Sequence, residues 1–302
     1  MVNQKNTVII IAGPTAVGKT AVAIEIAKHF GTEIISSDSR QCYKELNIGV
    51  ARPSVEELQE VKHHFIASHS IHENITAASF EKFSLAKTEE IFMKNRVVVI
   101  AGGTGLYIKA FCEGLDEIPE IPGAIRDEVI NQYNVYGLPW LQEEVRKTDP
   151  LFSKVGEMQN PQRLIRALEV LRTTGKSIVS FRKKEKKKRS FEMIKIGLEL
   201  PKETLHQNIN ERVDKMIESG LVEEAHSLVP YQHLNALQTV GYKELFCYFD
   251  GAYTLHDAAE AIKKNTRQYA KRQMTWFKND ATYKWFEGSE KKNIVEYLQL
   301  PV

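Results

Sequence analysis

The chain has 302 residues, of which 42% are hydrophobic and 26% charged, with a net charge of +2, and this is the composition of a globular protein with a substantial core. Its longest apolar stretches, such as residues 8–12 and 97–101, are far shorter than the roughly 20 residues of a membrane helix, and the first residues lack the basic region and cleavage site of a secretory signal. The three cysteines, Cys42, Cys112 and Cys247, are too few and too widely spaced for a disulfide framework or a C-x-x-C metal site, so we expect a cytoplasmic protein without membrane association.

The first part of the chain alternates short apolar segments with helical ones. Residues 7–12 form a β-branched run typical of a strand that is buried on both faces, and a glycine-rich turn over 13–19 leads into a helix over 20–30. Further strands are predicted over 33–37 and 96–101, with a helix over 76–95 between them. Strands that alternate with helices imply a parallel sheet with right-handed crossovers.

The pattern changes near residue 115. Helical segments over 123–136, 139–147 and 161–174 are separated by prolines, with no buried strand among them. A strand over 193–200 then marks a return to the sheet. It is followed by predicted helices over 202–219, 221–228, 241–249 and 255–278 and a short strand over 283–286. We therefore expect a core built from residues 1–114 and 191–302, interrupted by a helical insertion over 115–190.

A complete phosphate-loop motif follows the first predicted strand. The sequence G-x-x-x-x-G-K-[ST] is matched by Gly13, Pro14, Thr15, Ala16, Val17, Gly18, Lys19 and Thr20. Glycines let successive backbone N–H groups converge on phosphate oxygens, and the helix N-terminus adds a positive dipole end. The lysine supplies a full charge, and the hydroxyl of Thr20 can ligate Mg²⁺. The fold class predicted is thus α/β, a P-loop NTPase-like parallel sheet flanked by helices, and the ligand is a di- or triphosphate.

One carboxylate, Asp38, ends a predicted strand near this loop. The strand over 97–101 ends instead in glycines, so the aspartate that usually supports the metal of an NTP hydrolase is missing there. Open α/β sheets bind substrate at the carboxyl ends of their strands. Asp38 could cap a local turn, or it could act as a general base toward a transferred group.

Two stretches of the chain are strongly basic. The window 161–190 has two acidic residues and a net charge of +9. Its eleven basic residues are Arg163, Arg166, Arg172, Lys176, Arg182, Lys183, Lys184, Lys186, Lys187, Lys188 and Arg189. The window 261–285 carries +6. Such clusters attract polyanions, although any one lysine run could equally be a solvated surface.

These segments together resemble the tRNA dimethylallyltransferase (tRNA isopentenyltransferase) family over nearly the whole chain. The specific blocks are D-S-R-Q-C-Y at 38–43, P-Q-R-L-I-R-A-L-E at 161–169 and A-K-R-Q-M-T-W at 270–276, and G-G-T-G-L-Y at 102–107 and V-G-Y-K-E at 240–244 also match. The Cys/His spacing of the zinc finger that eukaryotic members often carry is missing, so we expect the bacterial form.

The resemblance implies transfer of a dimethylallyl group from dimethylallyl diphosphate to the exocyclic amine (N6) of the adenosine 3′-adjacent to the anticodon (position 37), in tRNAs that read codons beginning with U. It implies Mg²⁺ as cofactor, a monomer, and the tRNA anticodon stem-loop as partner. The catalytic residues would be Asp38 as base, Thr104 and Lys19, with Arg212 as a second cation on the diphosphate. The tRNA contacts would come from Asp38, Ser39, Arg40, Gln41, Thr104, Arg126, Gln162, Arg163, Leu164, Ile165, Arg166, Gly241, Tyr242, Lys243, Lys271 and Arg272, with 183–189 adding affinity for the RNA backbone. Gln41 would fill the space left by the flipped base or hold the neighbouring bases.

Apart from that resemblance, other functions remain open. A P-loop nucleoside or small-molecule kinase would share the loop and the sheet. An adenylate isopentenyltransferase acting on free AMP or ATP would share the donor site and Asp38, and a non-catalytic RNA-binding switch would share the basic stretches. On the helix over 255–278 we expect Ile262, Thr266, Tyr269, Gln273 and Phe277 to face the core, with Lys264, Arg267, Lys271 and Lys278 along another stripe. Trp276 and Trp285 are also expected in the core.

Overall fold

The computed structural model describes residues 5–182 and 185–298 and divides the chain into two compact units. One unit is Glu113–Lys187, and the other contains the residues on both sides of it. Each unit has its own hydrophobic core. Within the described residues, no helix is long and apolar enough to cross a membrane.

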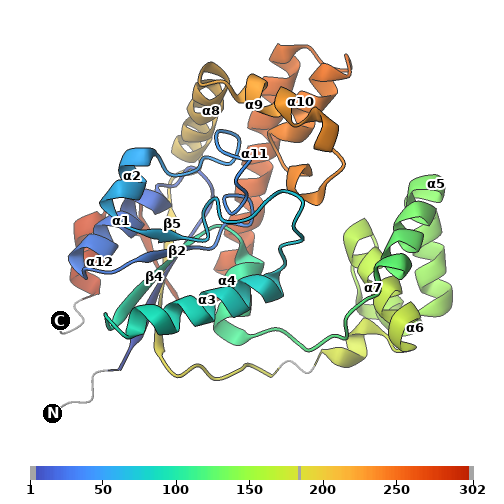
Figure 1. Ribbon diagram of the computed structural model, residues 1–302, viewed down its shortest axis with the longest axis horizontal. Coiled ribbons are helices and arrows are strands. Elements are labelled where there is room, and N and C mark those ends of the chain that lie inside the picture. Colours follow the sequence, from blue (N-terminus) through green and yellow to red (C-terminus); the bar gives the residue numbers. More distant parts are fainter. Residues whose placement is uncertain (1–4, 183–184, 299–302) are drawn as a thin grey trace. The chain divides into compact units, whose positions relative to one another are not determined.

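The larger unit is built on the predicted parallel sheet (Figure 1). Its six strands lie in the order β3-β2-β4-β1-β5-β6, and every neighbouring pair is parallel. The strands are β1 (Thr7–Ala12), β2 (Ile34–Ser36), β3 (His63–His64), β4 (Val97–Gly102), β5 (Glu192–Glu199) and β6 (Tyr283–Glu287). The predicted fold class is confirmed, and only the two-residue edge strand β3 was not expected.

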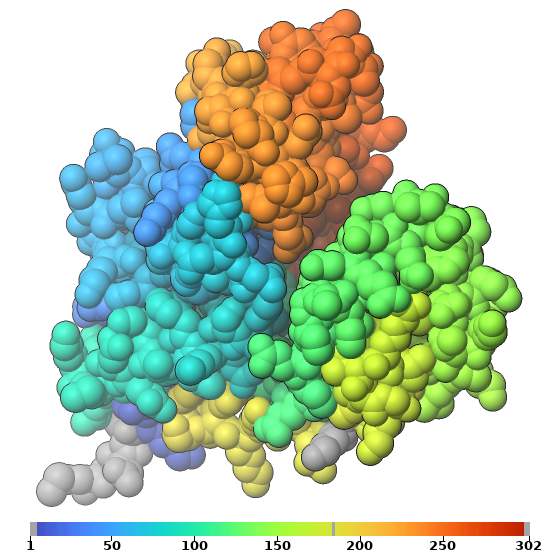
Figure 2. Space-filling model, turned by 45° about the vertical axis from the view of Figure 1, so that its right-hand side comes forward, coloured from blue at the N-terminus to red at the C-terminus, as the bar shows by residue number. Residues whose placement is uncertain are grey.

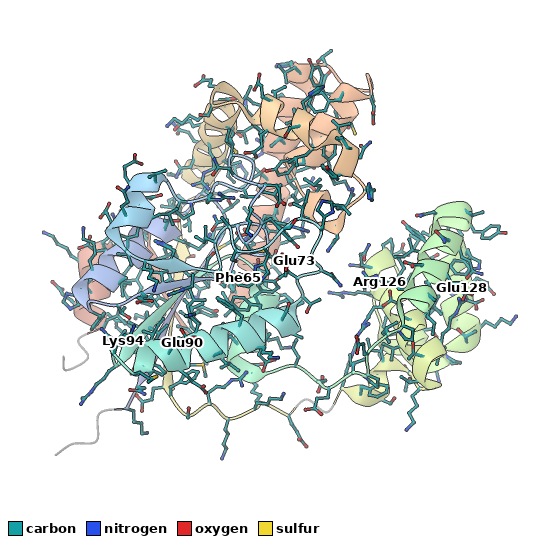
Figure 3. All side chains as sticks on the ribbon, in the orientation of Figure 1. Phe65, Glu73, Glu90, Lys94, Arg126 and Glu128 are labelled. Atoms are coloured by element: carbon teal, nitrogen blue, oxygen red, sulfur yellow. The ribbon has the colours of Figure 1, made fainter. Side chains whose placement is uncertain are left out.

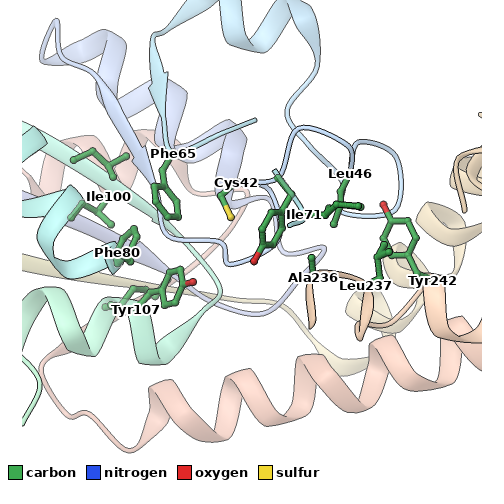
Figure 4. Close-up of a cluster of buried hydrophobic side chains, with 14 of the residues drawn as sticks. Cys42, Leu46, Phe65, Ile71, Phe80, Ile100, Tyr107, Ala236, Leu237 and Tyr242 are labelled. Carbon is green, nitrogen blue, oxygen red and sulfur yellow. The ribbon is translucent and has the colours of Figure 1, made fainter. Parts of the chain in front are cut away.

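The central strand β1 is buried on both faces, and its alternate residues pack into two different hydrophobic clusters. Val8 and Ile10 pack in one cluster, whereas Ile9 and Ile11 pack in the other. Successive side chains of a strand point to opposite faces of the sheet, and in this β-branched run both faces are apolar. Figure 4 shows the first cluster, which extends from Ile100 on the sheet to Tyr242 beyond its carboxyl edge.

Helices cover the sheet and extend beyond its carboxyl edge. Those of the larger unit are α1 (Lys19–His29), α2 (Val55–Glu60), α3 (Ala77–Phe92), α4 (Gly105–Glu113), α8 (Lys202–Glu218), α9 (Leu221–Ser227), α10 (Tyr242–Phe249), α11 (Leu255–Lys278) and α12 (Lys291–Tyr297), with short 3₁₀ turns at Val229–Tyr231 and Asn235–Leu237. The helices α2 and α12 were not predicted. Each has only six or seven residues, too short for a clear helical period.

The smaller unit is helical, and Figure 2 shows it in green to yellow. It contains α5 (Gly123–Thr148), α6 (Pro150–Val155), α7 (Pro161–Thr174) and a 3₁₀ turn at Ile178–Phe181. Gly137, with φ of 72°, breaks α5 into the two helices that the sequence predicts. The guanidinium of Arg172 on α7 donates to carboxylates of Glu128 and Glu144, one on each half of α5.

The insertion boundaries differ from the expected 115–190, because Arg189 belongs to the larger unit. Its side chain is buried, pairs with Glu81 at 2.9 Å, and donates to the backbone carbonyls of Ala110 and Phe111. Arg189 therefore fastens the start of β5 to α4 and is not available for RNA. Lys183 and Lys184 lie outside the described residues.

Candidate active site

The phosphate loop lies between β1 and α1 at the carboxyl edge of the sheet. Gly13 (φ 153°) has no room for a side chain, because an added Cβ would lie 2.6 Å from the carbonyl oxygen of Leu198. Ala16 (φ 64°) and Gly18 (φ 96°) take left-handed conformations that turn the loop into the first turn of α1. A loop of this shape, opening a helix, is a cradle for phosphate oxygens.

Two cations line this cradle. The ammonium of Lys19 donates to the carbonyl oxygen of Pro14 at 2.6 Å, and Nη1 of Arg212 on α8 donates to Oγ1 of Thr15 at 3.4 Å. The pKa of Lys19 is lowered to about 7, chiefly by burial; Asp38 opposes this shift and Arg212 adds to it. Burial also lowers the pKa of Arg212. Lys19 and Arg212 are half-buried, and although Asp38 and Glu57 face them, two cations beside a phosphate loop favour an anionic ligand.

Asp38 follows β2 and is held by its own turn. Its Oδ1 accepts hydrogen bonds from the backbone N–H of Arg40 at 2.8 Å and of Gln41 at 3.3 Å. Among the described residues, Oδ2 has no hydrogen-bond partner. The same side chain thus caps a turn and presents a free carboxylate oxygen, so the two interpretations left open by the sequence are both compatible with the structure.

Thr104 connects the loop after β4 to the residue beside Asp38. Its Oγ1 accepts the backbone N–H of Ser39 at 3.0 Å and donates to the hydroxyl of Ser39 at 3.3 Å. Arg40 extends the other way and donates to the carbonyl oxygens of Asn235 and Ala236 at 2.8 and 3.1 Å. These bonds fix the segment 38–41 on both sides.

Gln41 braces a loop of the protein. Its Nε2 donates to the carbonyls of Val50 and Ala51 at 3.3 and 2.9 Å, and its Oε1 accepts from the hydroxyl of Ser36 at 3.3 Å. Both polar atoms of the amide are therefore engaged. The structure does not place Gln41 free to fill the space of a displaced base.

Two cavities meet at these residues. The first, of about 400 Å³, contains the phosphate-loop residues Lys19 and Thr20, and the second, of about 560 Å³, is lined by polar residues of α10 and α11. Both are lined by Thr15, Asp38, Val50, Ala51, Arg212 and Tyr269. The site can thus hold one ligand on the phosphate loop and a second on the other side of Asp38.

The second cavity receives several of the predicted RNA-contacting residues. Arg40, Gly241, Lys243 and Arg272 line it, and the side chains of Lys243 and Arg272 are exposed. Lys271 is exposed on the neighbouring position of α11. The cavity wall is therefore cationic at its exposed residues, which suits a nucleotide with its flanking phosphates.

Tyr242 corrects the expectation of a contact to tRNA. Its side chain is fully buried, and its hydroxyl donates to Oε1 of Glu224 at 2.6 Å. Glu224 also accepts the backbone N–H groups of Asn47, Ile48 and Gly49 at 3.2, 2.8 and 3.0 Å. Tyr242 and Glu224 hold the loop that walls both cavities, so the tyrosine supports the site without touching a ligand.

On the smaller unit, exposed arginines share one buried carboxylate. Glu169 of α7 is 2% exposed, and its oxygens lie 3.8 Å from Nε of Arg126 and 3.3 Å from Nη1 of Arg166. Arg126 and Glu128 leave α5 on different sides (Figure 3). Gln162 and Arg163 are exposed on the first turn of α7. Polar residues of α5 and α7 therefore present a cationic surface.

The family resemblance assigns the side chains of Leu164 and Ile165 to RNA contact, and the structure contradicts this. Both are buried in the core of the smaller unit with Leu168, because the apolar stripe of α7 packs against α5. Their side chains cannot reach a ligand, and their positions within the matched block are explained by packing.

The sequence also misjudged α11. Ile262, Gln273 and Phe277 are buried as predicted, although Gln273 also lines the first cavity, whereas Tyr269 is 36% exposed and lines both cavities. Trp276 is 43% exposed, and Trp285 is partly buried with the ammonium of Lys278 3.8 Å from its ring centre. The helical period placed Tyr269 and Gln273 correctly on one stripe, but it cannot distinguish a core from a cavity.

A magnesium ion would find few protein ligands here. Among the described residues, no group of three or more His, Cys, Asp or Glu side chains could hold a metal. Mg²⁺ at phosphate sites is commonly bound by one or two protein oxygens with substrate phosphates and water. The hydroxyl of Thr20, which lines the phosphate-loop cavity, suits that arrangement.

Fold and site together define a P-loop enzyme whose phosphate loop lies beside a carboxylate and a second cavity. Residues 41–280 match the family model described as IPP transferase. The chain is 49% identical to a tRNA dimethylallyltransferase of Christiangramia forsetii, covering 98% of both chains, and 49% identical to that of Flavobacterium johnsoniae, covering 96% of both. The chain belongs to the tRNA dimethylallyltransferase family.

Solved structures agree with this assignment. A tRNA isopentenylpyrophosphate transferase of Bacillus halodurans is 34% identical over 97% of this chain and 96% of its own, with a TM-score of 0.72. A eukaryotic dimethylallyltransferase acting on tRNA is 24% identical, with a TM-score of 0.78 over 98% of this chain and 76% of its own. The latter likeness establishes the shared fold.

Proposed function

We propose that this protein transfers the dimethylallyl group of dimethylallyl diphosphate to N6 of the adenosine 3′-adjacent to the anticodon, position 37, in tRNAs that read codons beginning with U, and releases diphosphate. The observation that carries the proposal is that Asp38, Thr15 and Arg212 line both cavities. A donor held by its diphosphate on the phosphate loop and a base inserted from the second cavity would meet beside a carboxylate.

On the donor side, the phosphate loop would hold the diphosphate as leaving group. As the allylic C–O bond breaks, its electron pair moves to the bridging oxygen, and Lys19 and Arg212 stabilise the added negative charge. Both cations already donate to groups of the loop, so little reorganisation is needed during the reaction.

On the acceptor side, N6 of adenine attacks the allylic carbon and forms the new C–N bond. This amine is a poor nucleophile because its lone pair is delocalised into the ring. Oδ2 of Asp38 would accept the proton that N6 loses, while Oδ1 stays bonded to its own turn. Thr104, bonded to Ser39 beside Asp38, would orient the amine or the leaving phosphate.

Magnesium would be held by the Thr20 hydroxyl and the donor's phosphate oxygens. When bound, it supplies positive charge to the diphosphate as the leaving group departs. Lys19 and Arg212 provide the protein's own share of this charge, and each donates a hydrogen bond to the loop.

The target base lies in a folded loop and must be unstacked before it can enter the second cavity. Arg126, Gln162, Arg163 and Arg166 on the smaller unit would bind the anticodon stem-loop, with Lys243, Lys271 and Arg272 on the larger unit. These residues contact backbone phosphates or flanking bases and so place the adenosine without reading its reacting atom. We propose that the enzyme acts in the cytoplasm as a monomer.

The experiment offers labelled donor and acceptor in pairs. The protein is incubated with bulk tRNA and either dimethylallyl diphosphate labelled in the prenyl group or γ-labelled ATP, and separately with AMP in place of tRNA. Transfer of the prenyl label to tRNA supports the proposal. Transfer of phosphate from ATP would favour a kinase, prenylation of AMP in preference to tRNA would favour an adenylate isopentenyltransferase, and no transfer of either label would favour an RNA-binding switch.

A further inference from the structure

Gln273 of α11 joins the two loops that carry the reacting groups. Its Oε1 accepts the backbone N–H of Thr15 in the phosphate loop at 2.9 Å. Its Nε2 donates to the backbone carbonyl of Gly103 in the loop after β4, also at 2.9 Å. The side chain is 6% exposed; its bond to Gly103 is buried, and its bond to Thr15 is partly buried at the wall of the first cavity.

The orientation of the amide follows from its partners. The N–H of Thr15 must face the amide oxygen of Gln273, and the carbonyl of Gly103 must face its amide nitrogen. A flipped amide would lose both hydrogen bonds. A methionine of similar size would leave two buried backbone groups unpaired, and a glutamate would place an acceptor against the carbonyl of Gly103. Glutamine is thus the residue whose chemistry matches both loops.

The side chain of Gln273 packs directly against Gly103, where a larger residue would have no room. A Cβ added at Gly103 would overlap Nε2 of Gln273. Three residues further along α11, the indole of Trp276 occupies the space in front of Gly105 in the same way. Gln273 and Trp276 therefore pack against Gly103 and Gly105, the two glycines on either side of Thr104 in the sequence.

We propose that Gln273 is a positioning residue that sets the distance between the phosphate loop and Thr104, and thereby between the diphosphate donor and the attacking amine. Because the backbone N–H of Thr15 is already bonded to Gln273, that N–H group is not available to bind the diphosphate. The inference rests on the proposed prenyl transfer, and of the two roles proposed there for Thr104 it takes the orientation of the amine.

This role predicts a separation between kinetic constants. A displacement of about 1 Å between reacting groups can cost on the order of 100-fold in rate, whereas the tRNA-binding surface is untouched. For Gln273→Met we expect kcat to fall about 10- to 100-fold, with the Kd for tRNA and the KM for dimethylallyl diphosphate within about twofold of wild type. Gln273→Glu retains the bond to Thr15 but adds a negative charge beside the donor, so its kcat falls and its KM for the donor rises as well.

The matched control is Gln207→Met, which makes the same change at an exposed glutamine of α8. All variants are compared by thermal unfolding and by single-turnover prenylation of tRNA. A Gln273→Met protein that is folded and turns over with kcat within about twofold of wild type would overturn the proposal, as would a variant whose tRNA affinity falls while kcat is retained.

A second route perturbs the same contact from the other loop. Gly103→Ala should lower kcat because the new Cβ displaces the amide of Gln273. In the double variant Gly103→Ala/Gln273→Ala the overlapping atoms are gone, so we expect kcat no lower than that of Gln273→Ala alone. Additive losses would show that Gly103 acts independently of Gln273 and would contradict the inference.

The two proposals fail separately. If the wild-type protein does not transfer the prenyl label to tRNA, the proposed function falls. If wild type transfers the label and the folded Gln273 variants transfer it equally fast, the function stands and the positioning role of Gln273 falls.

Discussion

Replacement of Asp38 by asparagine separates its two roles. Oδ1 accepts hydrogen bonds from the backbone N–H of Arg40 and Gln41, and Asn retains this acceptor. Oδ2 becomes an amide nitrogen that cannot take a proton. Because a positioned base contributes on the order of 10²–10⁴ in rate, we expect kcat to fall by that factor, about 3–5 kcal/mol of activation free energy.

Asp38→Ala removes the turn-capping acceptor as well. Each of the two hydrogen bonds contributes about 0.5–1.5 kcal/mol net, so this variant should lose about 1–3 kcal/mol in the free energy of unfolding. Asp38→Asn should lose less than about 0.5 kcal/mol. Urea unfolding measures the free energy of unfolding of both variants. Single-turnover prenylation at saturating donor and tRNA measures their rate of transfer.

A further consequence of Asp38→Asn concerns Lys19. The charge of Asp38 raises the pKa of Lys19 against the effect of burial, so its removal should lower that pKa further. The donor-binding pH profile of the variant should then shift toward lower pH. If Asp38→Asn transfers the prenyl group at the wild-type rate, Asp38 is not the base, and the account of the acceptor side is wrong.

Three other variants test separate parts of the structure. The pKa of Lys19 is lowered to about 7, so the lysine loses its charge above that pH and kcat/KM for the donor should fall as the pH rises through 7. Lys19→Arg should abolish this fall, because arginine keeps its charge. An unchanged profile in the variant would show that Lys19 does not titrate in the free enzyme. Charge reversal in Arg163→Glu should weaken tRNA binding and reduce the log–log salt slope by about 0.9 per lost duplex phosphate contact, and an unaltered slope would remove Arg163 from the RNA interface. Tyr242→Phe loses a buried hydrogen bond of 2.6 Å to Glu224, so the free energy of unfolding should drop by about 1.5–3 kcal/mol, and a drop below about 0.5 kcal/mol would mean that water replaces the hydroxyl.

The core of the fold and the donor site could be predicted because their signals are local. A β-branched run, a glycine turn and a lysine lie consecutively at 7–20, and Asp38 follows the next strand along the chain. Parallel strands bring their carboxyl ends to one edge, so this proximity follows from topology alone. The structure adds the observation that Asp38 is fixed through one oxygen only.

The acceptor side could not be predicted in the same detail, because its walls come from distant segments. The loop at Val50 and Ala51 is held by Gln41 and, through Asn47–Gly49, by Glu224 of α9. Nothing in the spacing of these residues indicates that they meet. For the same reason Tyr242 looked like a binding residue, although it is a buried support.

Helical periodicity was correct about faces and wrong about what covers them. On α11 it placed Ile262 and Phe277 on one stripe, and the structure buries both in the core. On α11 it grouped Tyr269 and Gln273 with apolar residues, but there the stripe continues from the core into the cavity. Polar or aromatic residues with a hydroxyl or amide on an otherwise apolar stripe are the signal that could have identified this wall.

The central claim is that the phosphate loop holds a diphosphate that leaves from carbon while Asp38 takes the proton of an adenine amine. Mass spectrometry of digested tRNA after incubation with dimethylallyl diphosphate and Mg²⁺ tests it most directly. The account predicts a gain of one C₅H₈ unit on the adenosine 3′-adjacent to the anticodon, with equimolar release of diphosphate. Unmodified adenosine at that position in tRNA that binds the protein, or a gain of phosphate when ATP is supplied instead, would contradict it.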